Sequence, residues 1–499
     1  MNRNTIKSLH IGVSSGRGIK MFVGRKKELE ALESFYNDDK KKVCCVTGQV
    51  GMGKTTLLKE FAKDKKHLFH IAYPTTDVGQ MVLFARSLGE IYEMPRFANT
   101  ANLQVLKEEY EIIPDFTELM DMIEEKAKGE KLLLIIDGYY NFVKADASYE
   151  KILFDYITSK WANNNIKLIV CGDSFLAMEK FVYGKKAIWK DTPMTMIELK
   201  GMGFYDSCEF FPDRDEEERT FLYGLTGGIP QHLSKIEGDL ENVAKELFLK
   251  PIHQAGLMPE ATMSIDLREL SYYNRILMTL AQGNARVNQI SALVNKPKDV
   301  VVPYMNTLIN IGVVEKNNAI TEKNNRKKTR YGIVNTNFLF WYRYIAPNID
   351  WYYSGKIRDM WSELIEPELA DYMKSVFVRM CKEYIRKEAD NGKMPFTVDD
   401  IGNWWENDED KGTSSGFDLV ALGKCEDKPC TVFGRCYYND EPIEMATLKD
   451  LIEMTKHVSA SGDVFYIVFS KSGFHENTLT VAGAIKNIML ITLEDVAKL

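Results

Sequence analysis

The chain has 499 residues, of which 45% are hydrophobic, so it is long enough for about three domains with buried cores. Its 64 Lys and Arg against 71 Asp and Glu give a formal net charge of −7, which excludes a uniformly basic nucleic-acid-binding surface but allows a local one. No apolar run reaches the roughly 18 residues of a membrane helix, and the basic segment 1–20 has no apolar centre, so we expect neither a membrane partner nor a secretory signal. The eight cysteines are scattered, which is typical of a cytoplasmic protein.

The first segments with a folded pattern follow Met21, and residues 1–20 before it are expected to form a disordered extension. Phe22–Arg25 predicts a short turn, and the apolar spacing after it predicts a helix over 26–36. A short apolar run at Val43–Thr47 then predicts a buried strand.

Residues 48–55 fit the phosphate-binding pattern G-x-x-x-x-G-K-[ST] without a mismatch, between that strand and an amphipathic helix at Thr55–Lys63. Glycines let backbone N–H groups turn toward an anion, and the helix N-terminus adds partial positive charge. We therefore expect Lys54 to reach the β- and γ-phosphates of ATP and the Thr55 hydroxyl to bind Mg²⁺. The remaining residues of this predicted ATP site are Gly48, Gly51, Gly53 and Thr56.

Strands and helices alternate after this loop, which predicts a parallel sheet covered on both faces. We expect this α/β fold, a P-loop NTPase domain, to span 21–250. Its further strands are predicted at His70–Tyr73, Lys131–Asp137 and Ile166–Asp173, and its helices at 78–92 and 115–128.

Asp137 ends an apolar strand and is the expected partner of Lys54 and Thr55, where it would bind Mg²⁺ through water. Many P-loop ATPases place a glutamate directly after this aspartate to orient the attacking water, but here the position holds Gly138. General-base assistance is worth about 10²–10⁴ in rate, so the sequence favours nucleotide binding over fast turnover. Asp173, at the end of the next strand, fits two interpretations equally: a group beside the γ-phosphate, or a helix N-cap.

Residues 266–345 predict a winged helix-turn-helix, because three helical patterns precede a β-hairpin. The helices are predicted at 270–282, 287–293 and 299–311, and the hairpin strands at 312–315 and 331–334. The third helix has almost no basic residues, so DNA binding through this segment is weighed against a spacer or coupling role. The hairpin loop does carry a basic cluster: Lys323, Arg326, Lys327, Lys328 and Arg330.

A third domain is predicted over 365–499, after an aromatic segment at Phe338–Tyr344 that is expected to pack as core. It begins with a helix at 367–388, the pair Trp404–Trp405 and a polar loop at 406–416. Strands follow at 417–422, 430–438 and 464–469, with a helix at 446–458 before the last strand. The cysteines of this part lack a CxxC pair, so we expect thiols rather than a zinc site at Cys425, Cys430 and Cys436.

The chain resembles the archaeal-type P-loop ATPases of the STAND/AAA-related group, in which the ATPase domain precedes a winged helix and a domain related to PD-(D/E)xK nucleases. The resemblance covers almost the whole chain after Met21 and rests on the order of its segments. Besides 48–55 and the strand that ends at Asp137, these are Phe22–Arg25 with Glu28 and Leu29, Gly227–Pro230, Phe338–Tyr344, Ile401–Trp405, Phe417–Ala421 and Phe469–Phe474.

The resemblance implies roles by position. Pro230, in a helical lid, would touch the nucleotide base, and Gly172–Asp173 would take the sensor position, where the family more often shows a small hydroxyl residue. The family usually has a glutamate at the position of Gly138, so the chain departs from it at the hydrolytic step. Residues near the adenine or ribose would be Val23, Gly24 and Arg25.

The third domain departs further from the family pattern. A nuclease of this type needs clustered carboxylates to hold Mg²⁺ and a lysine to support the reaction. Val378 stands at the position of the helix glutamate, Asp418 keeps the aspartate, and Arg435 and Tyr437 replace E-x-K. One carboxylate facing an arginine does not suit a cation that prefers several oxygen ligands. We therefore expect an Asp418–Arg435 ion pair and a nuclease-like fold without the chemistry.

The leading hypothesis is an ATP-binding switch with slow hydrolysis, a weak ATPase that converts ATP and water into ADP and phosphate. Its catalytic residues would be Lys54, Asp137 and Asp173, with Mg²⁺ held by Thr55 and Asp137. Closure on ATP would move the C-terminal domain toward a protein partner or a second copy of the chain. The alternatives are an ATP-gated DNA nuclease, a DNA-binding regulator that uses the winged helix, and a non-enzymatic scaffold.

Overall fold

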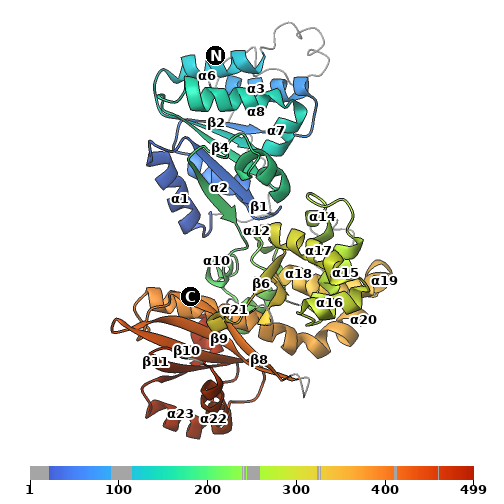
Figure 1. Cartoon of the computed structure of the whole chain (residues 1–499), viewed down its shortest axis with the longest axis vertical. Helices are drawn as coiled ribbons and strands as arrows, with labels where there is room; N and C mark the ends of the chain where they lie inside the picture. Colours follow the sequence, from blue (N-terminus) through green and yellow to red (C-terminus); the bar gives the residue numbers. More distant parts are fainter. Residues whose placement is uncertain are drawn as a thin grey trace, which may run out of the picture.

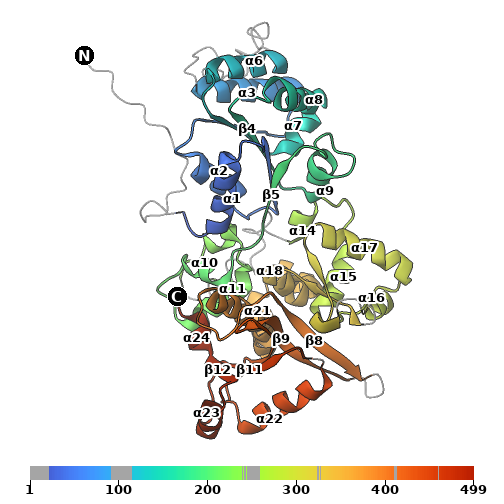
Figure 2. The same ribbon diagram turned by 60° about the vertical axis from the view of Figure 1, so that its left-hand side comes forward.

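The computed structural model describes residues 22–91, 115–238, 240, 243, 259–322, 325, 328–408, 413–458 and 460–499, so the predicted extension 1–20 lies outside the described residues. Two five-stranded sheets lie toward opposite ends of an elongated molecule, with a helical region between them (Figures 1 and 2). Within the described ranges, no helix has the length together with the apolar character that crossing a bilayer requires.

The first sheet is parallel throughout, with the strand order β2-β3-β4-β1-β5. Strands β1, β3 and β4 are short apolar runs that are buried along their whole length, as expected for a parallel sheet covered on both faces. The predicted α/β fold is confirmed, although β5 was not predicted. The strands are β1 Val43–Gly48, β2 His67–Ile71, β3 Leu132–Asp137, β4 Ile166–Gly172 and β5 Met194–Leu199.

Helices cover both faces of this sheet, because successive strand residues point to opposite sides. On one face, α1 Lys26–Asn37 and α2 Lys54–Ala62 pack on Leu133 and Ile135 of β3. On the other face, α3, α6, α7 and α8 pack on Leu132 and Leu134. The helices on this second side are α3 Asp77–Ile91, α6 Phe116–Ala127, α7 Tyr139–Ala145, α8 Ser148–Asp155 and α9 Phe175–Met178.

After β5 the chain enters the helical region that separates the two sheets. Four helices precede a group of three helices and a two-stranded antiparallel sheet, and this group has the order of elements predicted for 266–345. The first four are α10 Phe204–Cys208, α11 Glu216–Thr226, α12 Pro230–Leu233 and α14 Pro259–Met263. The others are α15 Ser271–Ala281, α16 Val287–Val294 and α17 Lys298–Asn310, followed by β6 Val314–Asn317 and β7 Arg330–Ile333.

The aromatic segment that was predicted as core is buried. It forms α18 Thr336–Phe340 and the π-helical turn Trp341–Ile345, and most of its aromatic side chains are inaccessible. The Tyr372 hydroxyl lies 2.8 Å from Gly224 O and 3.0 Å from Thr336 O, so it joins this segment to its neighbours. The chain continues through α19 Ile349–Tyr353 and α20 Ile357–Asp359 into α21 Leu369–Asp390.

The C-terminal sheet has the strand order β12-β11-β10-β9-β8. Strands β8, β9 and β10 pair antiparallel, whereas β10, β11 and β12 pair parallel. Helices α21 and α24 Leu493–Ala497 pack on one face, and α22 Met445–Met454 and α23 Glu476–Gly483 pack on the other. The strands are β8 Asp400–Asp408, β9 Thr413–Cys425, β10 Lys428–Tyr437, β11 Asp463–Ser470 and β12 Ile488–Thr492.

The predicted polar loop at 406–416 is wrong, because β8 extends to Asp408 and β9 begins at Thr413. Trp404 and Trp405 are strand residues, 3% and 5% exposed, in one apolar cluster with Ile320 of the helical region. The burial of this pair against a distant segment stabilises a strand in a stretch whose polar composition predicts a loop.

Candidate functional site

The phosphate-binding pattern forms a glycine turn between β1 and α2, at the carboxyl edge of the first sheet. Gly51 and Gly53 have φ angles of 85° and 80°, a left-handed backbone that other residues rarely adopt. Gly48 is needed for space, since a Cβ there would lie 2.6 Å from Leu199 O. The first N–H groups of α2 have no partner within the helix, so the turn and the helix end together present backbone donors to an anion.

Lys54 lies inside this turn and is 6% exposed. Its Nζ donates to Gly48 O at 2.7 Å and to Gln49 O at 2.8 Å, and it forms an ion pair with Asp173. Of the two interpretations of Asp173, the structure favours the position beside Lys54. The cap of the following helix α9 is Ser174, whose side chain accepts a hydrogen bond from Ala177 N at 3.0 Å.

The Thr55 hydroxyl donates to Asp137 Oδ2 at 2.5 Å across the edge of the sheet. A hydroxyl and a carboxylate side by side are hard oxygen ligands, so these two residues fit the Mg²⁺ ion that the sequence predicts. Burial, and after it the Asp137 carboxylate, raises the pKa of the adjacent Cys171 thiol well above its usual value, so this thiol stays protonated. Thr56, the last residue of the predicted loop site, is exposed on the first turn of α2.

Gly138 follows Asp137 in a left-handed conformation, with a φ angle of 81°. A Cβ at this position would lie 2.6 Å from Ala72 O, closer than side chains are found to backbone oxygens. The Gly138 N–H donates to Cys171 O at 2.9 Å, which fixes the turn between β3 and α7. The backbone after β3 therefore has no room for a side chain at the position where many P-loop ATPases carry a glutamate.

Arg25 ties the start of α1 to the phosphate loop. The residue is 6% exposed, and its guanidinium donates to Met52 O at 3.0 Å and to Lys200 O at 2.7 Å. Glu28 accepts a further bond at 2.9 Å. The side chain is therefore occupied by carbonyl and carboxylate oxygens of the protein itself. The other predicted residues of this segment, both partly exposed, are Val23 and Gly24.

The predicted lid lies directly on the phosphate loop. Gln231 N, on α12, donates to Gly51 O at 3.2 Å. A Cβ added at Gly53 would lie 3.7 Å from Pro230 Cγ, so the proline ring stands opposite the loop glycine with room for about one methyl group between them. The lid and the loop are thus joined through the main chain at Gly51.

Two further contacts join the site to the helical region. Gln49 Nε2, in the loop, donates to Ile311 O at 3.3 Å, just after α17. Asp266 accepts from Ser174 Oγ at 2.5 Å and from Leu176 N at 3.0 Å, so a carboxylate that precedes α15 holds the N-terminus of α9. The first half of the loop, at Gln49 and Gly51, and the segment after β4 are therefore bonded to parts of the chain outside the first sheet.

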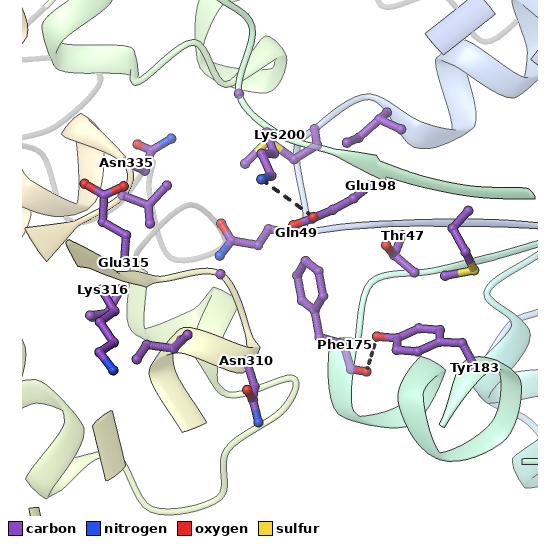
Figure 3. Close-up of a pocket in the computed structure, with 18 residues that line it drawn as sticks. Thr47, Gln49, Phe175, Tyr183, Glu198, Lys200, Asn310, Glu315, Lys316 and Asn335 are labelled. Carbon is purple, nitrogen blue, oxygen red and sulfur yellow. Dashed lines mark hydrogen bonds and ion pairs between the residues drawn. The ribbon is translucent and has the colours of Figure 1, made fainter. Parts of the chain in front are cut away.

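A cavity of about 820 Å³ lies between the edge of the first sheet and the helical region (Figure 3). Gln49 and Phe175 line it from the first sheet, and Asn310 and Glu315 line it from α17 and the β6–β7 hairpin. Because Gln49 belongs to the phosphate loop, this space adjoins the candidate site, and the loop has room to change shape on this side.

Sequence reasoning missed four residues that connect the site to its surroundings. Gln49 is an unspecified position of the loop pattern and Gln231 directly follows Pro230, so both lie in segments that the sequence had marked. Asp266 and Asn335 had no such signal, because their partners Ser174 and Gly227 lie 92 and 108 residues away in sequence. The Asn335 amide donates to Gly227 O at 2.9 Å and thereby fixes the turn that leads into the lid.

In the C-terminal sheet, the predicted ion pair between Asp418 and Arg435 is wrong. Asp418 Oδ2 accepts from Cys436 N at 3.0 Å, whereas Arg435 Nε donates to Gly416 O at 3.3 Å. Main-chain groups of the adjacent strand satisfy both charges, which is why the side chains do not pair. Among the residues that the structure describes, no three His, Cys, Asp or Glu side chains form a group that could hold a metal ion.

A parallel sheet whose first strand leads through a glycine turn into a helix, with Lys54, Thr55 and Asp137 at its carboxyl edge, defines an ATP-binding P-loop ATPase. Residues 22–236 match the family described as "ATPase domain predominantly from Archaea". Residues 341–449 match a second family, described as "Archaea bacterial proteins of unknown function". Residues 22–236 are therefore similar to P-loop ATPase domains.

Relatives are found among sequences and solved structures. An uncharacterized protein of Methanocaldococcus jannaschii is 25% identical over 408 residues, which cover 82% of this chain and 86% of that protein. An uncharacterized ATP-binding protein of the same organism is 47% identical over 49 residues, or 10% of this chain and 83% of that protein. The Walker-type ATPase of Pyrococcus abyssi has a TM-score of 0.48 at 15% identity, covering 64% of this chain and 96% of that one. The Aeropyrum pernix ORC2 protein, solved in ADPNP–ADP complexes, has a TM-score of 0.43 at 12% identity, covering 65% of this chain and 93% of that one.

Proposed function

We propose that the protein is a nucleotide-dependent switch, which binds ATP with Mg²⁺, hydrolyses it slowly and passes its nucleotide state to the C-terminal sheet. The observation that supports this is the attachment of the phosphate loop to segments outside its own sheet, through Gln231 N to Gly51 O and through Gln49 to Ile311 O. A loop that rearranges around a triphosphate would shift both partners. Differential affinity of about 2–3 kcal/mol between two arrangements is enough to change their populations strongly.

The loop residues would bind the triphosphate. The Lys54 ammonium would leave Asp173 and contact the β- and γ-phosphates, because the phosphates carry more negative charge than the carboxylate. Backbone N–H groups of the turn, from Gly48 to Gly53, and of the first residues of α2, including Thr56, would donate to phosphate oxygens. Thr55 and Asp137 would hold Mg²⁺, which neutralises charge on the phosphates.

The base would lie between the start of the described chain and the lid. Val23 and Gly24 are partly exposed beside the loop, and Pro230 faces Gly53 from the lid side. Arg25 would act as a positioning residue, since its guanidinium is held by Met52 O and Lys200 O.

Slow hydrolysis follows from the backbone at Gly138, which leaves no side chain to activate water. A typical turnover of about 10 s⁻¹ reduced by 10²–10⁴ gives an expected kcat of about 10⁻³–10⁻¹ s⁻¹. Asp173, once released from Lys54, would be the acid that orients the water. Asp173→Asn should therefore lower kcat while ATP binds more tightly, because Lys54 then loses its competing partner.

The described basic residues of the β6–β7 hairpin favour a coupling role over DNA binding. Lys328 Nζ lies 5.1 Å from the ring centre of Trp404, and the Arg330 guanidinium lies 4.7 Å from that of Trp405. The hairpin is therefore packed on the C-terminal sheet and would transmit a movement to it. The other members of the basic cluster, which are Lys323, Arg326 and Lys327, lie outside the described residues.

Hydrogen exchange on the full chain tests the switch, with ADP compared against a slowly hydrolysed ATP analogue, both with Mg²⁺. We expect the analogue to change protection in α12, in α9 and around Ile311. Lys54→Ala should show no response, whereas Lys59→Ala, exposed on the same helix, should respond like the wild type. If saturating nucleotide changes hydrogen-exchange protection only inside the first sheet, the switch is ruled out, whereas the proposal that the protein binds ATP stands.

Light scattering on the same samples tests for self-assembly. A molar mass that rises with the ATP analogue and stays constant with ADP would make a second copy of the chain the partner. A constant mass in both states would favour a different protein.

A further inference from the structure

Two adjoining cavities lie where the β6–β7 hairpin and α21 meet the C-terminal sheet. Their volumes are about 720 and 330 Å³, and no residue of the phosphate loop lines either of them. Together they are large enough for a ligand of nucleotide size. The residues that line both are Arg330, Lys374, Asn403, Trp405 and Asp418.

The lining of this double cavity carries more basic than acidic side chains. Six are basic and four acidic, although the chain as a whole carries a net charge of −7. Two of the acids, Glu368 and Asp371, form ion pairs with Arg343 at 3.1 and 2.8 Å. An excess of positive charge in one hollow favours an anionic ligand. The basic residues are Arg330, Arg343, Lys374, Arg379, Lys382 and Arg435, and the acidic ones are Glu315, Glu368, Asp371 and Asp418.

The carboxylate that lines both cavities does not cancel the charge. It is Asp418, the one carboxylate that lines the smaller cavity, and it is bound to Cys436 N. Lys382 Nζ donates to Asn403 Oδ1 at 2.5 Å and has no ion-pair partner among the described residues. A single carboxylate does not suit a divalent metal, whereas a half-buried ammonium such as that of Lys382 gains from an anion beside it.

We propose that this double cavity binds a compact phosphate-bearing ligand, of nucleotide size or smaller, without a metal ion. Phosphate oxygens accept charge-assisted hydrogen bonds from guanidinium and ammonium groups, and the exposed Lys374 lies where such a ligand enters. A nucleic-acid strand fits less well. Arg330 and Arg435 are half-buried around a hollow rather than spread along an open face, and Trp404 and Trp405 are covered, so neither ring offers a face for stacking bases.

Calorimetry on full-length Lys54→Ala tests this site without the ammonium of the phosphate loop, so the result does not depend on the proposed switch. Inorganic phosphate, pyrophosphate and AMP are titrated with EDTA present, beside a single DNA strand of about 12 nucleotides. We expect saturable binding of pyrophosphate and AMP that EDTA does not change. Adding Lys374→Ala should weaken it about five- to tenfold. Adding Arg386→Ala, exposed on the same helix and outside the cavity lining, should change nothing.

Lys382→Met is the second variant, because it keeps most of the aliphatic side chain and removes an ammonium that lines the larger cavity. We expect it to weaken pyrophosphate binding about fivefold. Three outcomes would overturn the proposal: no saturable binding of any of the three phosphates, binding that neither Lys374→Ala nor Lys382→Met weakens, or tighter binding of the DNA strand than of AMP.

Discussion

Each five-stranded sheet carries a candidate aspartate, at the end of β3 in the first sheet and in the middle of β9 in the second, and the surroundings of the two acids differ. Asp137 of the first sheet contacts the Thr55 hydroxyl beside a glycine turn that offers further backbone donors. Asp418 of the C-terminal sheet is bound to Cys436 N, and cationic side chains line the space around it. The first arrangement suits a triphosphate with its metal ion, and the second suits a metal-free anion. The partners of an acid, rather than the acid itself, decide which chemistry its site supports.

The largest expected effect separates the two anion sites by single lysines. Lys54→Ala should lower ATP affinity about a thousandfold, or about 4 kcal/mol, because a buried charge-assisted contact to the phosphates is lost. Lys374→Ala should leave ATP affinity within about twofold, because Lys374 lines only the C-terminal cavities. Titration with a fluorescent ATP analogue measures the affinity of both variants. An equal loss of affinity in the two would mean that the loop and the C-terminal cavities are not separate anion sites.

Acid should destabilise the first half of the molecule before the C-terminal sheet. His70 on β2 and His232 on α12 are buried, and burial lowers the pKa of each to about 4. Unfolded histidine titrates near 6.5, so below that pH the unfolded chain binds more protons than the folded one. This contribution to stability is present above about pH 6.5 and is lost as the pH falls toward 4. Between pH 7 and pH 5 each histidine should lower the free energy of unfolding by about 2 kcal/mol.

Urea unfolding at pH 7 and pH 5, combined with region-resolved hydrogen exchange, measures this effect. His70→Phe keeps a ring against Phe84 and Phe142, so it should remove about half of the pH-dependent loss. Acid unfolding that begins in the C-terminal sheet would contradict the assignment to these two histidines.

The position after Asp137 provides a smaller effect with a matched control. Gly138→Ala should cost about 3 kcal/mol, because a left-handed backbone and a close approach to Ala72 O both oppose a side chain. Gly129 has a similar φ angle of 75° with nothing within 4 Å of an added Cβ, so Gly129→Ala should cost about 1 kcal/mol. Denaturant unfolding gives both values. Equal costs would mean that the turn after β3 adjusts to a side chain, so that steric conflict does not exclude a glutamate at position 138.

The smallest expected effect concerns the carboxylate that joins the helical region to the first sheet. Asp266→Asn should cost about 1 kcal/mol and reduce the response of α9 to the ATP analogue in hydrogen exchange. Asp215→Asn is the control, because Asp215 caps α11 by accepting from Glu218 N at 2.8 Å and lies outside this contact. It should cost a similar free energy and leave the response unchanged. A full response in Asp266→Asn would remove this contact from the coupling route.

Local pattern was sufficient for four of the five strands of the first sheet and for the centre of its site. Lys54 and Thr55 are identified by the loop pattern, and Asp137 by its place at the end of an apolar run of strand length. Parallel pairing of the strands then brings these residues to one edge of the sheet. The same reasoning located the three helices and the hairpin that follow, because each has its own periodicity.

Features that depend on packing between distant segments were not predictable. β8 is polar apart from Ile401, Trp404 and Trp405, and the strand is stabilised by burial of the two tryptophans against Ile320, which lies in another part of the chain. The interactions of Arg435 depend on the register of β9 and β10, which brings Gly416 O within reach and leaves Asp418 to a main-chain donor. The interactions of Asp266 depend on how the helical region packs on the first sheet.

The lid contact has a kinetic consequence. Gln231 N is bonded to Gly51 O and Pro230 stands opposite Gly53, so α12 and the loop cannot move independently while this contact lasts. In the proposed switch, the rate at which α12 separates from the turn would then limit how fast the loop exchanges its nucleotide, and the chain would retain a record of its last nucleotide until that separation.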